Sequence, residues 1–138
     1  MLGVKNYETK YIDSCRNIIN NQLASYRNLI KSVPKVADTV ITDFETQFLN
    51  NLVVVLDTFF VHRIRAIEGK DGNPLNEVRM LCNSLLNNGG RLTTDKTIKY
   101  TVASSVLKIK IGEDIKFGII EFETLTEIFF KHIEKKYS

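Results

Sequence analysis

The segment TDFETQFLNNLVVVLDTFFVHRIRAI, residues 42–67, constrains the fold most because it is apolar on more than one side. Its apolar residues recur with helical periodicity, although the run LVVVL also permits a short buried strand. Thr42 and Glu45 fit a capping box at the start of a helix. A helix that is apolar on more than one face is covered by neighbouring helices or by a second subunit. The sequence therefore predicts a central helix over residues 42–67.

Three other segments have the periodicity of amphipathic helices. Asn73 followed by Pro74 is typical of a helix start, because the asparagine side chain accepts a hydrogen bond from a free amide and proline lacks one. The run NNGG, residues 87–90, is a typical helix stop because asparagine and glycine accept left-handed geometry. The predicted inward side chains of the first helix are Tyr11, Cys15, Ile18, Ile19, Tyr26, Leu29 and Ile30, with Leu23 beside them. The helical segments are residues 6–31, 74–87 and 121–137.

The segments TIKYTV, residues 97–102, and VLKIKI, residues 106–111, alternate apolar side chains with lysines, as strands do. A single hairpin is marginal alone, so we expect it to pack on the helices. The predicted fold is mainly α, with four principal helices packed as a bundle and a small β-hairpin at about residues 97–111 before the C-terminal helix. No repeat, low-complexity tract or linker interrupts the 138 residues, which predicts a single domain over residues 1–138.

The composition argues against several classes of function. A net charge of +3 is small, and basic and acidic residues are interspersed, which disfavours a nucleic-acid partner. The candidates for nucleic-acid contact are Lys99, Lys108 and Lys110 on the predicted hairpin, whose ordinary role is solubility. The longest apolar run, LVVVL, is too short to span a membrane. The N-terminus has no apolar stretch of signal-peptide length, so we expect a cytoplasmic location.

No pattern of catalytic, metal-ligating or cofactor-binding residues is recognisable. Cys15 and Cys82 are predicted to fill core space. The run DGNPLNE resembles the start of a calcium loop, but the twelfth position from Asp71 is Cys82 rather than glutamate. We therefore predict no catalytic residues, no metal and no cofactor.

The stretch HRIRAIEGKDGNPLNEVR, residues 62–79, is a polar corner between apolar segments. In the predicted helix, Arg63 shares its helical angle with Leu56 and Phe59, so its guanidinium is expected to be buried and to need a partner. Glu77 is the first candidate and Asp71 the second. One interpretation is structural: Arg63 and Glu77 join two helices. We favour it because ion pairs and caps are the ordinary use of such residues at helical corners.

The other interpretation of this corner is a site for a small anionic ligand. Arginine forks suit carboxylate or phosphate, free amides at a helix N-terminus attract anions, and a histidine can transfer protons near neutral pH. The predicted ligand-binding residues are His62, Arg63, Arg65, Glu68, Asp71, Asn76 and Glu77.

The run FFVHRIRAIEGKDGNPLNEVRMLCNSLLNNGG, followed by TIKY and SVLKIKIG, resembles a small family of bacterial helical proteins with a GKDGNPLNEVR-type core and no assigned activity. The likeness covers about residues 52–137 and implies a small, stand-alone bacterial cytosolic protein. The two-sided apolar segment and the absence of a recognisable catalytic constellation lead us to expect a non-enzymatic interaction or scaffold protein that forms a homodimer. The alternative is a small-anion-binding protein or enzyme that uses the polar corner.

Overall fold

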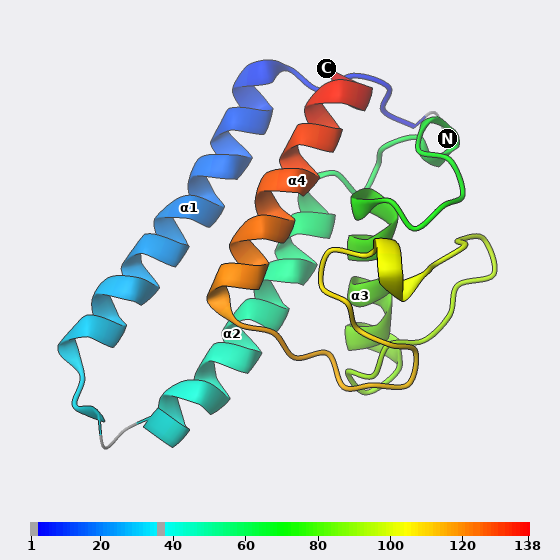
Figure 1. Ribbon diagram of the computed structural model, residues 1–138. Helices are drawn as coiled ribbons and strands as arrows, with labels where there is room; N and C mark the ends of the chain where they lie inside the picture. The colour runs from blue at the N-terminus through cyan, green and yellow to red at the C-terminus, as the bar shows by residue number, and fades with distance from the viewer. Residues whose placement is uncertain (1–2, 36–37) are drawn as a thin grey trace.

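The computed structural model describes residues 3–35 and 38–138, and the protein is mainly helical. Figure 1 shows α1 on one outer side and α3 on the other, with α2 and α4 between them. Two short 3₁₀ turns, Arg65–Ile67 and Val102–Ser104, lie in the connections. The four α-helices are α1 (Thr9–Ser32), α2 (Asp38–Phe59), α3 (Pro74–Asn87) and α4 (Ile119–Tyr137).

The second helix is central, as its two-sided apolar character predicts. It contacts α1, α3 and α4. One face of its C-terminal half is fully buried, and one hydrophobic cluster joins this face to the other three helices and to the connection before α4. The buried side chains of this half, with the aromatic ring just after it, are Leu49, Leu52, Val53, Leu56 and Phe60.

The predicted limits of this helix are wrong at both ends. Thr42 lies inside α2 and donates its hydroxyl hydrogen to the Asp38 carbonyl at 2.9 Å, so it is not the start of the helix. At the other end the helix stops at Phe59 and not at residue 67. There the chain bonds to the N-terminal segment instead of continuing the helix. The Val4 N–H donates to the His62 carbonyl at 2.8 Å, and the Val4 carbonyl accepts from the Ile64 N–H at 3.0 Å. A contact far apart in sequence therefore ends the helix.

The predicted limits of α3 are confirmed. The Asn73 side chain accepts a hydrogen bond from the Asn76 N–H at 3.0 Å, and Pro74 begins the helix. Beyond its end, Gly89 and Gly90 both have positive φ angles, which glycine adopts without a steric penalty. These signals act within a few residues of each other, so the sequence alone defines this helix.

The first helix is rotated relative to its predicted orientation. Its buried side chains are Ile12, Cys15, Ile19, Leu23 and Tyr26. By contrast Tyr11, Ile18 and Leu29, which the periodicity predicts as inward, are exposed. The predicted burial of Cys15, Ile19, Leu23 and Tyr26 is confirmed. The apolar stripe is wider than the side that packs, so periodicity alone does not select which edge of it stays exposed. Tertiary contacts made the selection.

The predicted β-hairpin is absent, because no strand forms within the described part of residues 97–111. Ile98 and Ile109 are buried, as the alternation suggests, but their segments do not pair. The carboxylate of Glu77 instead accepts the Val106 and Leu107 N–H groups at 2.8 and 3.0 Å. Lys108 then has a φ angle of +58°, in the left-handed region. A second strand cannot pair here, because the Val106 and Leu107 amides already bind the Glu77 side chain and Lys108 has a left-handed backbone conformation.

The α1–α2 pair extends beyond the rest of the molecule. These helices have 24 and 22 residues, whereas α4 has 19 and α3 has 14. Figure 1 shows the C-terminal end of α1 and the N-terminal end of α2 projecting past the start of α4. Within the described residues, no helix is long and apolar enough to cross a membrane.

Candidate functional site

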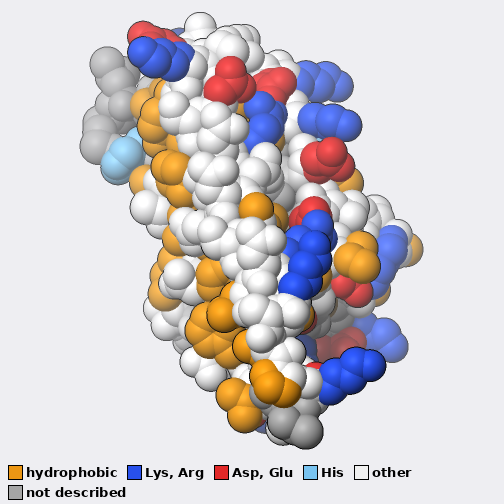
Figure 2. Space-filling view, turned by 90° about the vertical axis from the view of Figure 1, so that its left-hand side faces the viewer, with side chains coloured by type: hydrophobic (Ala, Val, Ile, Leu, Met, Phe, Trp, Pro, Cys, Tyr) orange, Lys and Arg blue, Asp and Glu red, His pale blue; other side chains and the backbone are white. Residues whose placement is uncertain are grey.

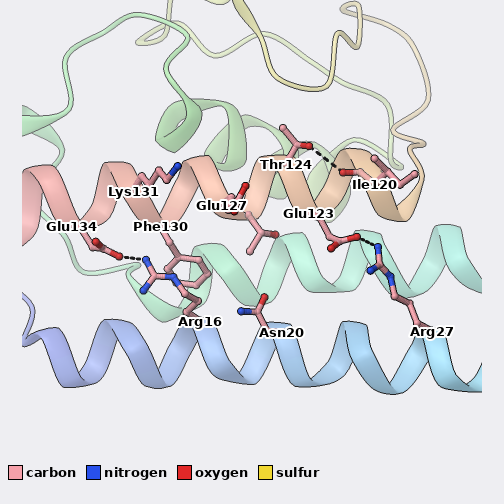
Figure 3. Close-up of a pocket in the computed structure, with 11 residues that line it drawn as sticks. Arg16, Asn20, Arg27, Ile120, Glu123, Thr124, Glu127, Phe130, Lys131 and Glu134 are labelled. Atoms are coloured by element: carbon pink, nitrogen blue, oxygen red, sulfur yellow. Dashed lines mark hydrogen bonds and ion pairs between the residues drawn. The ribbon is translucent and has the colours of Figure 1, made fainter.

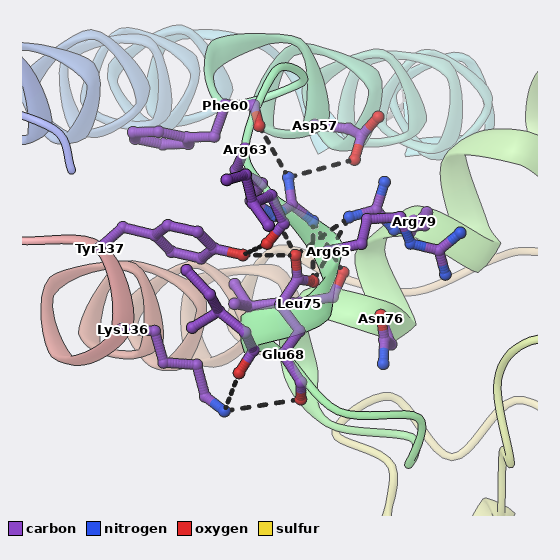
Figure 4. A network of polar contacts seen from close by, with 12 residues as sticks. Asp57, Phe60, Arg63, Arg65, Glu68, Leu75, Asn76, Arg79, Lys136 and Tyr137 are labelled. Atoms are coloured by element: carbon purple, nitrogen blue, oxygen red, sulfur yellow. Dashed lines mark hydrogen bonds and ion pairs between the residues drawn. The ribbon is translucent and has the colours of Figure 1, made fainter. Parts of the chain in front are cut away.

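The polar corner contains a buried ionic cluster centred on Glu68 (Figure 4). The side chains of Glu68 and Arg63 are both 0% exposed. Three donors converge on Glu68 Oε2: Arg63 Nε at 2.9 Å, Arg79 Nη2 at 3.2 Å and the Tyr137 hydroxyl at 2.7 Å. We call these four residues the Glu68 cluster. It connects the segment after α2 with α3 and with the last turn of α4.

The guanidinium of Arg63 is surrounded by further acceptors. Nη1 donates to the Phe60 carbonyl at 3.1 Å and lies 3.8 Å from an Asp57 carboxylate oxygen. Nη2 donates to Glu68 Oε1 and to the Leu75 carbonyl, each at 3.4 Å. Two arginines and two carboxylates thus share one buried site, which offsets the large desolvation penalty of each charge.

The predicted burial of Arg63 is confirmed, but the predicted partner is wrong. The partner is Glu68, not Glu77 or Asp71. The 3₁₀ turn Arg65–Ile67 reverses the chain, with the Glu68 N–H donating to the Arg65 carbonyl at 2.9 Å, and so returns the carboxylate to Arg63. A continuous helix through residue 67, as the sequence predicts, would have placed these side chains on different faces.

Sequence reasoning does not identify two members of the cluster, Arg79 and Tyr137. Burial, and then the charge of Arg63, lower the pKa of Arg79. Burial, followed by the hydrogen bond to Glu68, raises the pKa of Tyr137. Its hydroxyl also lies 2.6 Å from the Ile64 carbonyl, so the last turn of α4 is fixed to the segment after α2. Tyr137 lies 69 positions from Glu68, and no local pattern in the sequence links them.

Of the other residues predicted to bind a ligand, two are buried and hold loops in place. The Asn76 side chain donates to the Gly69 and Asp71 carbonyls at 3.2 and 2.8 Å. Glu77 binds the amides of the loop at residues 106–107, and burial raises the pKa of its carboxyl group. The remaining three predicted residues, His62, Arg65 and Asp71, are exposed. The seven residues therefore do not line one cavity.

A groove of about 700 Å³ lies between α1 and α4 (Figure 3). Ion pairs between Arg16 and Glu134 and between Arg27 and Glu123 bridge it. The Arg16 guanidinium also stacks over the Phe130 ring, 5.1 Å from its centre. The two arginines are eleven positions apart, about three helical turns, so they lie on the same face of α1. This spacing is the signal in the sequence for the pair of ion pairs. The ion pairs join the two helices across the groove.

A second groove, of about 350 Å³, lies between the projecting ends of α1 and α2. The rings of Tyr26, Phe44 and Phe48 pack together in it, with centres 5.1 Å apart for Tyr26–Phe48 and 5.7 Å for Phe44–Phe48. Figure 2 shows hydrophobic side chains gathered along one side and the lower part of this face of the molecule, and charged side chains on the other side. The residues that define this α1–α2 groove are Asn21, Gln22, Ser25, Tyr26, Leu29, Phe44 and Phe48.

The described residues contain no group of three or more histidine, cysteine or acidic side chains placed to hold a metal ion. Cys15 and Cys82 are both buried and unpaired with each other. Burial, with Asp57 beside it, raises the pKa of Cys82 to about 11, which favours the thiol over the reactive thiolate.

Comparisons with protein-family models, with curated proteins and with solved structures found no match to this chain. The resemblance to a bacterial family therefore stays a prediction. A function for this chain must be argued from its two contrasting regions, the closed Glu68 cluster and the open α1–α2 groove.

Proposed function

We propose that this protein is a non-enzymatic interaction protein that forms a homodimer through the α1–α2 groove. One observation carries the proposal: large apolar side chains stay exposed around the groove. Of the lining residues, Leu29 is 53% exposed and Phe44 50%, and Val40, one helical turn before Phe44, is 71% exposed. A contiguous exposed apolar surface on a small domain typically marks a site of association.

The apolar surface continues along α1. Tyr11, Ile18 and Leu29 are each more than 40% exposed. They are spaced by seven and eleven positions, which brings them back to one face of the helix. A surface of this length suits another helix packed alongside it better than it suits a small ligand.

The charges of the two helices favour a second copy of the chain as the partner. The sequence of α1 contains four basic residues and one acidic residue, whereas α2 contains four acidic residues and no basic one. In a two-fold dimer the same patch packs on itself, so α1 of one protomer can lie against α2 of its partner. Exposed Lys31 would then face exposed Asp38 and Asp43 at the open end.

Analytical ultracentrifugation at tens of micromolar tests this proposal. The expected result is a dimer that Leu29→Glu or Phe44→Glu weakens by roughly 30-fold or more, because an unpaired charge would be buried at the centre of the interface. The matched control is Leu86→Glu, since Leu86 is 65% exposed on α3 and outside the groove. A monomeric wild-type protein, or equal dissociation by Leu86→Glu, would contradict the proposal.

The alternative function is binding of a small anion at residues 62–79. Among the predicted residues, only the exposed side chains of His62, Arg65 and Asp71 are open to a ligand from solvent. Arg65 is the member with a specific observation in its favour, because no carboxylate oxygen of the described residues lies within 4.0 Å of its guanidinium.

A further inference from the structure

We infer that Arg65 and Lys70 form a binding site for a phosphate group, in a groove separate from the proposed dimer surface. This groove has a volume of about 360 Å³, within the range of small-ligand sites. Both side chains are exposed, and none of the described residues that line the groove is acidic. We call it the Arg65 groove, and its lining residues are Arg65, Ala66, Gly69, Lys70 and Thr97.

Arg65 differs from every other arginine of this chain. The sequence has six arginines. Among the described residues, Arg65 alone has no carboxylate oxygen within 4.0 Å of its guanidinium. Where arginines are so consistently paired, an unpaired one beside a groove indicates an anion that comes from outside the chain. The five paired arginines are Arg16, Arg27, Arg63, Arg79 and Arg91.

The guanidinium of Arg65 is nevertheless held in position. Its Nη2 donates to the Thr97 hydroxyl oxygen at 3.0 Å. That hydroxyl donates its own hydrogen to Asp95 at 2.6 Å, and the Thr97 N–H donates to the same carboxylate oxygen at 2.7 Å. Asp95 therefore positions the Thr97 hydroxyl, and Thr97 in turn positions the guanidinium of Arg65. The other guanidinium N–H groups of Arg65 form no hydrogen bond within the described chain and stay available to a ligand.

The second cation, Lys70, lies on a loop whose backbone is hydrogen-bonded to the segment at Lys99. The Lys70 carbonyl accepts from the Lys99 N–H at 2.6 Å. The preceding residue, Gly69, has a φ angle of +82°, which a side chain would make strained. Like Arg65, Lys70 has no carboxylate within 4.0 Å among the described residues. Arg65 and Lys70 thus present to one groove two positive charges that form no ion pair with the described residues.

Two cations match the charge of a phosphate dianion better than the single charge of a carboxylate. The arginine fork can bind two phosphate oxygens at once, and lysine contributes a compact point charge. Charge-assisted hydrogen bonds of this kind are the strong ones in proteins. Inorganic phosphate and phosphate monoesters share this chemistry.

Amide NMR shifts of the ¹⁵N-labelled protein, titrated with inorganic phosphate at a fixed ionic strength of about 0.15 M, test the inference. The expected result is a saturable shift confined to residues 65–70 and 97–99. Sodium acetate at the same ionic strength should bind at least roughly tenfold more weakly. Arg65→Gln should weaken phosphate binding by roughly tenfold or more, and Lys70→Gln by several-fold. Apart from amides near the substituted residue and near Thr97, which loses its hydrogen bond from Arg65, the spectrum should stay unchanged because both side chains are exposed.

The matched controls remove the same charge elsewhere. Arg91→Gln removes an exposed arginine paired with Asp114, and Lys110→Gln removes an exposed lysine. Both should bind phosphate within twofold of the wild type. Absence of a saturable shift, equal weakening by the controls, or acetate binding as tight as phosphate binding would overturn the inference.

Discussion

The Glu68 cluster and the α1–α2 groove invert the usual distribution of polar and apolar side chains. In the cluster, two arginines and a glutamate lie inside the protein, and the side chains of Arg63 and Glu68 are fully buried. In the groove, Leu29 and Phe44 remain half exposed. In the cluster each charge meets an opposite charge, and only Arg79 Nε among the atoms of its charged groups is buried without a hydrogen-bond partner in the described structure. The groove is incomplete, because nothing in the described chain covers it.

This difference separates stability from function. A buried charge with all its partners present contributes to one defined arrangement of the chain and leaves little for a ligand to bind. An exposed apolar surface contributes little to the folded monomer and gains most when a partner removes it from water. Substitutions in the cluster should therefore change unfolding, whereas substitutions in the groove should change association.

The largest expected effect is that of Arg63→Met. It leaves Glu68 buried with Arg79 as its remaining cation, so we expect the free energy of unfolding to fall by about 3–5 kcal/mol in urea denaturation. Glu68→Gln in the same background should recover part of this loss, because it removes the unpaired charge. The control Arg91→Met affects an ion pair whose side chains are 69% and 77% exposed, and should cost less than about 1 kcal/mol. An equally small loss for Arg63→Met would refute the structural role of the cluster.

Tyr137→Phe should have the next largest effect. It keeps the buried ring but removes the hydroxyl that meets Glu68 and the Ile64 carbonyl. We expect a loss of about 1–3 kcal/mol in thermal or urea unfolding, because a buried acceptor loses its donor. Tyr11→Phe is the matched control: its hydroxyl donates to the Phe59 carbonyl from an exposed side chain, and its loss should cost less. Equal losses for the two variants would show that burial of the hydroxyl in the cluster does not increase its contribution to the free energy of unfolding.

Glu77→Gln should change how stability depends on pH. Burial raises the pKa of Glu77 above its ordinary value of 4.5, so the folded protein holds this proton to higher pH than the unfolded chain does. Between these two pKa values, the contribution of Glu77 to stability falls as the pH rises. Glu77→Gln has no such proton, so its free energy of unfolding should fall less steeply than that of the wild type as the pH rises above 4.5. Parallel curves for the variant and the wild type would exclude this role of the carboxyl group.

The smallest effect on monomer stability should come from the groove. Leu29→Gln replaces a side chain that is 53% exposed, so the free energy of unfolding of the dilute monomer should change by less than about 0.5 kcal/mol. The same substitution should still weaken the proposed dimer in sedimentation at tens of micromolar. A large loss of monomer stability would instead assign Leu29 to the core, and the contrast between the two regions would disappear.

Several features follow from the sequence because their causes are local. The α3 helix is an example: the Asn73 cap, Pro74 and the glycines beyond residue 88 lie within or next to the helix that they define. The four helices and the central place of α2 likewise follow from apolar periodicity. The burial of Arg63 was also foreseeable, although the continuous helix that suggested it does not exist.

Other features depend on contacts between segments far apart in the chain, and periodicity cannot report these. The Val4 backbone helps to end α2, Glu77 binds amides that a hairpin would have used, and Tyr137 reaches Glu68 across 69 positions. Local pattern thus determined which segments of this protein are helical. Only the tertiary structure decided where α2 stops, which face of α1 packs, and which charge meets which, because each depends on the free energy of burying groups that distant segments supply.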